Sequence, residues 1–234
     1  MKAVLALLIA GKLGKLLLTG GTMLLSLFTY AIVYGWWYAV GFVALLFTHE
    51  MGHFLAARQR GLNVGAPTFI PFVGAWIALK DQPLDAETEA YIGIAGPMLG
   101  SAAAFVCYLL ARDSGSGLLF ALSYAGFILN LFNLIPITPL DGGRIVSVIS
   151  PRIWLLGIPM LGGLFIWRQS PLLLLIAIVA IPQAWSVLRN KSAMESEYYR
   201  VAANVRIQYA FQYLALTAVL SIMALEVHET LGIK

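Results

Sequence analysis

The side chains with the clearest capacity for chemistry lie in one short run, His49-Glu50-Met51-Gly52-His53. If this run is helical, the i, i+4 spacing places both imidazoles on one face, about 40° apart at roughly 3.6 residues per turn. Two imidazoles so arranged can bind zinc, and the glutamate between them can act as a base toward a water molecule held there. The run therefore predicts a catalytic zinc centre.

The surroundings of this run are apolar, and residues 36–48 carry no charge. Hydrophobic residues make up 60% of the chain and charged residues 11%, with a mean hydropathy of +0.85. A soluble domain carries about 25% charged residues. Ionisable groups at membrane depth cost several kcal/mol and indicate function by default. The sequence therefore predicts a metal site inside a lipid bilayer.

Charge and cysteine content exclude other classes. The formal net charge is +4, and no basic run is interleaved with aromatic residues, so we expect no nucleic-acid partner. The single cysteine, Cys107, allows no intrachain disulfide and is expected to be a small buried hydrophobe. Residues 1–18 lack a convincing cleavage site and are expected to form an amphipathic juxtamembrane helix.

A membrane-spanning helix needs about 20 mostly apolar residues. The expected fold is an all-α polytopic membrane protein with six or seven transmembrane helices, forming a single domain over residues 1–234. The fifth candidate contains Pro159 and Gly162-Gly163, so it is tilted, broken or re-entrant. The candidate spans are Leu16–Tyr34, Trp36–Ala57, Tyr91–Ala111, Leu118–Ile135, Ile153–Trp167, Leu172–Leu188 and Tyr209–Leu225.

The basic residues distribute unevenly when seven spans are threaded alternately through the bilayer. All but three of the 15 fall on the side of the N-terminus, and the exceptions are Arg112, Arg168 and Lys234. Lysine and arginine are enriched in cytoplasmic loops. The layout therefore predicts a cytosolic N-terminus, and an outside C-terminus if the fifth and sixth spans cross or fold back as a pair.

Of the 11 acidic residues, only Glu50 and Asp141 lie in otherwise apolar sequence. Asp141 follows a segment, residues 133–140, that prolines break. Irregular backbone at membrane depth is tolerated where it is buried or lines a cavity. Catalytic zinc takes three protein ligands, and His49, His53 and Asp141 complete that set, with Glu50 left as general base. The alternative for Asp141 is the N-cap of a helix over 142–149.

Residues 64–80 are apolar but contain two prolines and a central glycine, and they are too short for a span. They are rich in strand formers, and Pro71–Gly74 suits a turn. We expect a re-entrant β-hairpin beside the site, whose open strand edge holds an extended substrate by β-augmentation. The alternative is a structural interfacial loop. The expected substrate-binding residues are Phe72, Gly74, Trp76 and Ile77.

Three motifs together resemble the site-2 proteases, intramembrane zinc metalloproteases of the M50 type. They are the histidine run at 49–53, Gly96-Pro97-Met98-Leu99-Gly100, and Asn133 with Leu140-Asp141-Gly142. The combination is highly specific, and the resemblance covers about residues 36–150. Many members have asparagine where this chain has Gly100, so no polar side chain is expected at that position.

The resemblance implies roles and context. His49, His53 and Asp141 would bind one zinc ion, Glu50 would activate water, and Asn133 would position substrate or stabilise the oxyanion. The alternative for Asn133 is a buried amide that bonds backbone freed by Pro136. Gly96 and Gly100 would let helices approach closely. The flanking spans fit a small bacterial-type member.

For such a member we expect a catalytic core over about 36–150, accessory helices over 151–234, and a bacterial plasma-membrane location. The expected partners are a transmembrane protein substrate and the lipid bilayer. No PDZ or CBS domain is evident, so regulation is expected to come from a partner or from shedding of the substrate.

Two other functions fit the sequence less well. A metal transporter or regulator would want polar groups along a path across the bilayer, whereas this sequence has one compact cluster. A membrane zincin of the other type would use a glutamate on a later helix as third ligand, and no embedded glutamate follows Glu50.

Overall fold

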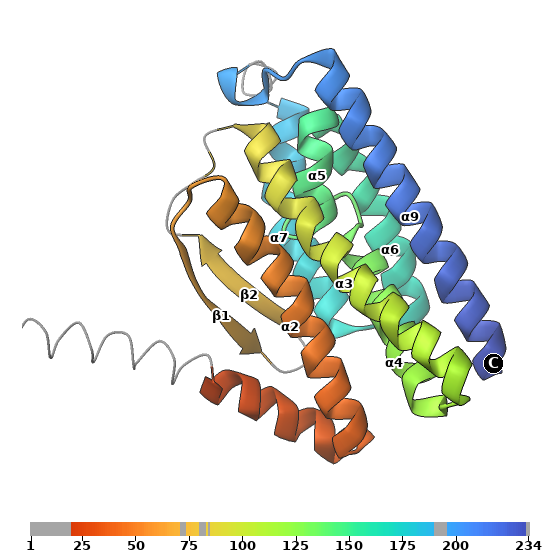
Figure 1. Ribbon diagram of the computed structural model, residues 1–234. Coiled ribbons are helices and arrows are strands. Elements are labelled where there is room, and N and C mark those ends of the chain that lie inside the picture. The colour runs from red at the N-terminus through yellow and green to blue at the C-terminus, as the bar shows by residue number, and fades with distance from the viewer. Residues whose placement is uncertain (1–19, 71–73, 80–82, 84, 190–195, 233–234) are drawn as a thin grey trace, which may run out of the picture.

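The computed structural model describes residues 20–70, 74–79, 83, 85–189 and 196–232, and the statements below concern these residues. The chain forms a bundle of helices with one β-hairpin on its flank (Figure 1). The expected N-terminal juxtamembrane helix lies outside the described residues.

Three described helices are long and apolar enough to cross a membrane: α2 (Trp36–Gln59), α3 (Ala86–Ser114) and α9 (Ala203–Leu231). Each contains a predicted span, so these three predictions are confirmed as long apolar helices. α2 and α3 pack side by side along the centre of the bundle, and α9 lies along one edge, against α4 (Gly117–Asn133) (Figure 1).

Local signals fix the ends of the central helices. Gly61 follows α2 with a φ of 76°, and the amides of Gly61 and Leu62 donate to the carbonyls of Arg58 and Ala57. This is the Schellman pattern that glycine favours at a helix C-terminus. α3 begins after Asp85, whose carboxylate accepts a hydrogen bond from the Thr88 amide at 2.6 Å.

The other predicted spans appear as shorter or broken helices. Gly20–Tyr34 is helical and turns into α2 at Gly35, at a wide angle to it (Figure 1). The predicted span Ile153–Trp167 is indeed broken, into a 3₁₀ turn, η1 (Pro151–Leu156), and α6 (Gly157–Arg168). α4 has 17 residues and α7 (Pro171–Arg189) has 19. The count of six or seven spans stays a prediction.

The segment between α4 and the short helix α5 (Asp141–Ile149) is irregular, as its prolines predict. Its apolar residues Ile135, Ile137 and Leu140 are buried against α6 and α7. The hydroxyl of Tyr213, on α9, donates to the carbonyl of Leu134 at 2.6 Å. Helices from the second half of the chain therefore hold this segment in place.

A two-stranded antiparallel hairpin forms where the sequence predicts one, from β1 (Val64–Ile70) and β2 (Gly74–Leu79). The register pairs Thr68 with Trp76 and Ile70 with Gly74. Both strands lie against α2 (Figure 1). Insertion of this hairpin into a membrane stays a prediction.

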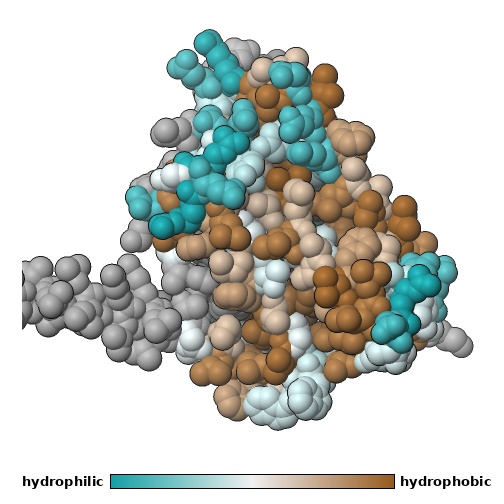
Figure 2. Space-filling model, viewed as in Figure 1, coloured by the Kyte–Doolittle hydropathy of each residue, from teal (hydrophilic) through white to brown (hydrophobic). Residues whose placement is uncertain are grey.

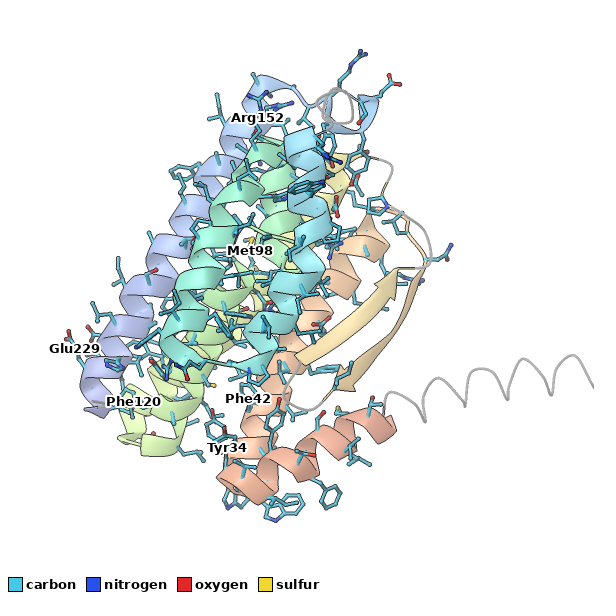
Figure 3. All side chains as sticks on the ribbon, turned by 180° about the vertical axis from the view of Figure 1, so that it is seen from behind. Tyr34, Phe42, Met98, Phe120, Arg152 and Glu229 are labelled. Carbon is cyan, nitrogen blue, oxygen red and sulfur yellow. The ribbon has the colours of Figure 1, made fainter. Side chains whose placement is uncertain are left out.

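The surface is apolar over the middle of the bundle. Figure 2 shows a broad hydrophobic area with hydrophilic residues gathered at the two ends. In the view from behind, Arg152 lies at one end of the bundle, and Glu229, Phe120 and Tyr34 lie toward the other (Figure 3). Large apolar side chains of the described helices are strongly exposed, among them Ile166 at 78% and Phe211 at 74%. Exposed apolar area of this extent indicates contact with lipid or another apolar partner.

Candidate metal centre

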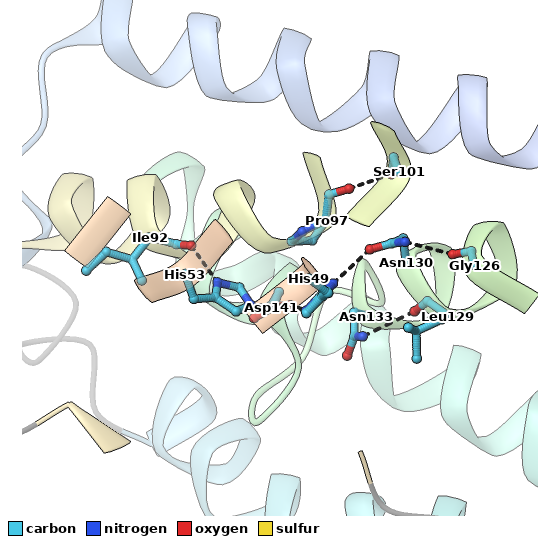
Figure 4. A network of polar contacts seen from close by, with 10 residues as sticks. All are labelled: His49, His53, Ile92, Pro97, Ser101, Gly126, Leu129, Asn130, Asn133 and Asp141. Carbon is cyan, nitrogen blue, oxygen red and sulfur yellow. Dashed lines mark hydrogen bonds and ion pairs between the residues drawn. The ribbon is translucent and has the colours of Figure 1, made fainter. Parts of the chain in front are cut away.

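Two helices bring four buried ionisable side chains together, and Figure 4 shows three of them, His49, His53 and Asp141. His49, Glu50 and His53 lie in the middle of α2, and Asp141 is the first residue of α5. The Oδ2 atom of Asp141 lies 3.1 Å from Nε2 of His49 and 3.2 Å from Nε2 of His53. The two Nε2 atoms are 3.1 Å apart.

The outer nitrogen of each imidazole has a fixed partner. Nδ1 of His53 lies 2.7 Å from the carbonyl oxygen of Ile92, and Nδ1 of His49 lies 2.8 Å from Oδ1 of Asn130. Both partners accept hydrogen bonds, so each imidazole donates from Nδ1, and when neutral it carries a lone pair on Nε2.

Three electron-pair donors therefore converge without a proton among them when the imidazoles are neutral. Such an arrangement is unfavourable unless a cation lies between the donors. Zinc–nitrogen bonds of about 2.0–2.1 Å in a tetrahedron place ligand atoms about 3.3 Å apart. The observed separations of 3.1–3.2 Å fit that spacing closely. His49, His53 and Asp141 are thus suited to hold zinc with one position left open.

Glu50 lies farther from the two Nε2 atoms than Asp141 does. One of its carboxylate oxygens lies within 4.8 Å of imidazole nitrogens of His49 and His53, and these three residues also form a group that could hold a metal ion. We assign the third ligand position to Asp141 because its oxygen is much closer to both Nε2 atoms. Glu50 is 6% exposed and stands beside the donors, as a base must.

The alternative role of Asp141 as an N-cap is wrong. The N-cap residue of α5 is Leu140, and no side chain caps this helix. Asp141 is inside the first turn, and its carboxylate faces the histidines rather than the helix amides.

Glycines permit the close approach of the elements that carry the site. A Cβ atom at Gly52 would overlap the backbone of Ala95, and one at Gly96 would overlap the His53 ring. Gly142 and Gly143 similarly face the backbone of the irregular segment before α5. The sequence interpretation of Gly96 as a packing position holds, but what it accommodates is the imidazole itself.

The two asparagines of α4 occupy different places. Asn133 donates from Nδ2 to the carbonyl of Leu129 at 3.2 Å, one turn back in its own helix. The sequence alternative expected Asn133 to bond a backbone group that Pro136 leaves without a partner. The Leu129 carbonyl is not such a group, because Pro136 is seven residues away from it. Asn130, which sequence reasoning missed, contacts His49 directly (Figure 4). The available signal was a second amide one turn before Asn133 in an otherwise apolar helix.

The expected substrate-binding residues are only partly described. Gly74, Trp76 and Ile77 lie on β2, whereas Phe72 lies outside the described residues. The structure places this strand next to the helix that carries the histidines.

Comparison with known proteins agrees with this geometry. The model of Peptidase family M50 matches residues 37–116 and 110–155, together about half of the chain and including all four clustered residues. A zinc metalloprotease of Methanocaldococcus jannaschii is 33% identical over 123 residues, which are 49% of this chain and 35% of that protein.

Two further relatives are named putative zinc metalloproteases. One, also from M. jannaschii, is 37% identical over 139 residues, covering 49% of this chain and 71% of its own length. The other, from Mycobacterium tuberculosis, is 33% identical over 116 residues, covering 46% of this chain and 29% of its own length. With the family match over the segments that build the cluster, these relatives show that the chain belongs to peptidase family M50.

Proposed function

We propose that this protein is a zinc-dependent endopeptidase that hydrolyses peptide bonds in or next to transmembrane segments of other proteins. The observation that carries the proposal is the convergence of two Nε2 atoms and one carboxylate oxygen within 3.2 Å. The two histidines lie in α2, which is apolar and long enough to span a bilayer, and the carboxylate comes from Asp141 at the start of α5. The relatives' names support zinc as the metal.

His49, His53 and Asp141 would hold the metal. A bound zinc ion polarises a carbonyl and makes water nucleophilic near neutral pH. Glu50 takes the proton of the attacking water and later delivers it to the leaving amine. Its burial suits this role, because a water-poor site keeps the proton between the reacting groups.

Asn133 would position the substrate or stabilise the oxyanion, as proposed from the sequence. It is the last residue of α4, the helix that also carries Asn130, the contact of His49. One of its Nδ2 hydrogens bonds the Leu129 carbonyl, and the second, which has no acceptor among residues 20–70, 74–79, 85–189 and 196–232, would be available to a substrate carbonyl.

The hairpin would hold the substrate in an extended form. A transmembrane helix hides its amide bonds, so a protease must bind the cleaved segment as a strand. β2 pairs with β1 along one edge, and its other edge has no strand partner among the described residues. Gly74, Trp76 and Ile77 on this strand, with Phe72 before it, would contact the substrate.

We further propose a bacterial plasma-membrane location with a cytosolic N-terminus and an unidentified regulatory partner. The apolar middle of the surface supports a membrane location (Figure 2), and the uneven distribution of basic residues along the sequence supports this orientation. A metal transporter fits less well, because the clustered ionisable groups lie at one point rather than along a path.

The test is co-expression of the full chain with tagged single-span membrane proteins. Wild type should release a shorter fragment from a substrate, and Glu50→Gln should reduce the rate by about 10²–10⁴ because it lacks the base. A conservative surface variant, Glu197→Gln, is the matched control, since Glu197 is exposed and begins the short 3₁₀ turn η2 (Glu197–Tyr199), which carries none of the clustered residues. Equal cleavage by wild type and Glu50→Gln contradicts the proposal.

A further inference from the structure

Asn130, on α4, is buried, with 1% of its surface exposed. Its Nδ2 donates to the carbonyl of Gly126 at 2.7 Å, and its Oδ1 lies 2.8 Å from Nδ1 of His49. A backbone carbonyl only accepts, so the bond to Gly126 fixes the direction of the amide. The amide oxygen must therefore face His49.

This contact selects one form of the His49 ring. A neutral imidazole carries its proton on either nitrogen, and the partner of one nitrogen decides which. With Oδ1 of Asn130 accepting from Nδ1, the lone pair of His49 is on Nε2, the atom nearest to Asp141 and His53.

The equivalent contact of His53 is with the backbone of Ile92, which side-chain substitution does not remove. His49 is therefore the histidine of this cluster whose orientation depends on another residue's side chain.

The amide of Asn130 fits because position 100 is a glycine. A Cβ atom at Gly100 would lie 2.5 Å from Oδ1 and 2.9 Å from Nδ2 of Asn130. Gly100 is on α3 and Asn130 on α4, so the two helices leave one volume that one carboxamide fills.

We propose that Asn130 is a positioning residue that fixes the tautomer and ring orientation of His49. Because Gly100 has no side chain, it leaves the space that the Asn130 amide occupies. The proposal rests on the proposed function only for the role of His49 as a ligand. Asn130 acts through His49, so its effect appears in metal binding whether or not a substrate is known.

The first measurement is zinc affinity, by competition with a chelator. Asn130→Leu keeps the volume and removes the acceptor, and should weaken zinc binding about 10–100-fold. Asn133→Leu is the matched control, because among the described residues the Asn133 amide bonds the Leu129 carbonyl and neither histidine, and it should leave the affinity within about twofold of wild type. The double change Gly100→Asn with Asn130→Gly returns a carboxamide to the same volume, and should recover much of the affinity.

The second measurement is the ¹⁵N spectrum of the imidazoles in zinc-loaded protein, because the ion occupies one ring nitrogen of His49 and leaves the proton on the other. With three histidines in the chain, the His49 signal is assigned by its loss in His49→Ala. Wild type should show the Nδ1–H form at His49, and Asn130→Leu a mixture of both forms.

If Asn130→Leu does not fold, Gly100→Ala gives the same answer, because its methyl group displaces the amide and should also weaken zinc binding. Its control is Gly162→Ala, where a Cβ meets nothing within 4 Å. Wild-type zinc affinity with an unchanged His49 tautomer in Asn130→Leu, or in Gly100→Ala if that variant alone folds, overturns the proposal. Loss of proteolysis alone in Asn133→Leu bears on the proposed function instead.

Discussion

The indole Nε1 of Trp154 donates a hydrogen bond to the carbonyl oxygen of Gly143, 2.7 Å away. The bond ties the 3₁₀ turn after α5 back to the first turn of that helix, two residues beyond Asp141. Trp154 is 4% exposed, so water does not compete for the bond. A residue outside the cluster thereby restrains the backbone that carries the proposed third ligand.

Trp154→Phe keeps most of the ring and removes this donor. We expect the free energy of unfolding, measured in detergent, to fall by about 0.5–1.5 kcal/mol. The affinity for zinc should also fall, because the backbone of Asp141 is less restrained. Trp37→Phe is the control, because Trp37 is 80% exposed. Equal effects of the two substitutions would show that the bond to Gly143 contributes nothing.

Purified protein should contain about one zinc ion per chain. His49→Ala, His53→Ala and Asp141→Ala should each reduce the content, whereas Glu50→Gln should retain it because Glu50 is not a ligand. Metal analysis of the detergent-solubilised protein measures this. Full zinc content in Asp141→Ala would refute the assignment of the third ligand.

Removal of zinc should also lower thermal stability. A ligand present at 1,000 times its Kd stabilises the folded state by about 4 kcal/mol. Chelator should therefore lower the Tm of wild type and of Glu50→Gln by similar amounts. It should have little effect on Asp141→Ala, and an equal shift in that variant would mean that the metal binds elsewhere.

Gly96→Ala should disturb the site although it adds only one methyl group. A Cβ at this position overlaps the His53 ring, so the ring must move and zinc content should fall. Gly162→Ala, at an open position of α6, is the matched control. Unchanged zinc content in folded Gly96→Ala would mean that the ring can relocate without loss of the ligand.

Substitution by proline tests whether the hairpin holds the substrate. Proline in place of Trp76 or Ile77 removes a backbone donor and bends β2. It should raise KM or abolish cleavage of a membrane substrate with zinc content unchanged, and alanine at the same position should do less. Equal loss of folded, zinc-loaded protein from both substitutions would favour the interfacial-loop alternative.

Much of the cluster was predictable because its parts carry local signals. The spacing of His49 and His53 needs only a helix, and Asp141 stands out as a carboxylate in apolar sequence. The hairpin followed from its strand formers and its turn residues. Three of the spans were recognisable from length and hydropathy, and α2, α3 and α9 confirm them as helices.

The contacts between helices could not be predicted from the sequence. The side chain that bonds His49 depends on how α4 faces α2, and periodicity does not fix that rotation. The same holds for Gly96, whose partner proved to be the His53 imidazole. It also holds for Trp154, whose bond to Gly143 depends on the path of the chain after α5.

The contact between Gly52 and the backbone of Ala95 and Gly96 has a consequence for movement. A shift of α3 along α2 would bring a side chain into a gap that holds only backbone atoms. Close-packed surfaces of this kind resist gradual sliding, so α2 and α3 act as one rigid block. Under the proposed function, the opening that admits a peptide would then come from the elements packed around this block, either the hairpin against α2 or α6 and α7 beside the segment before Asp141.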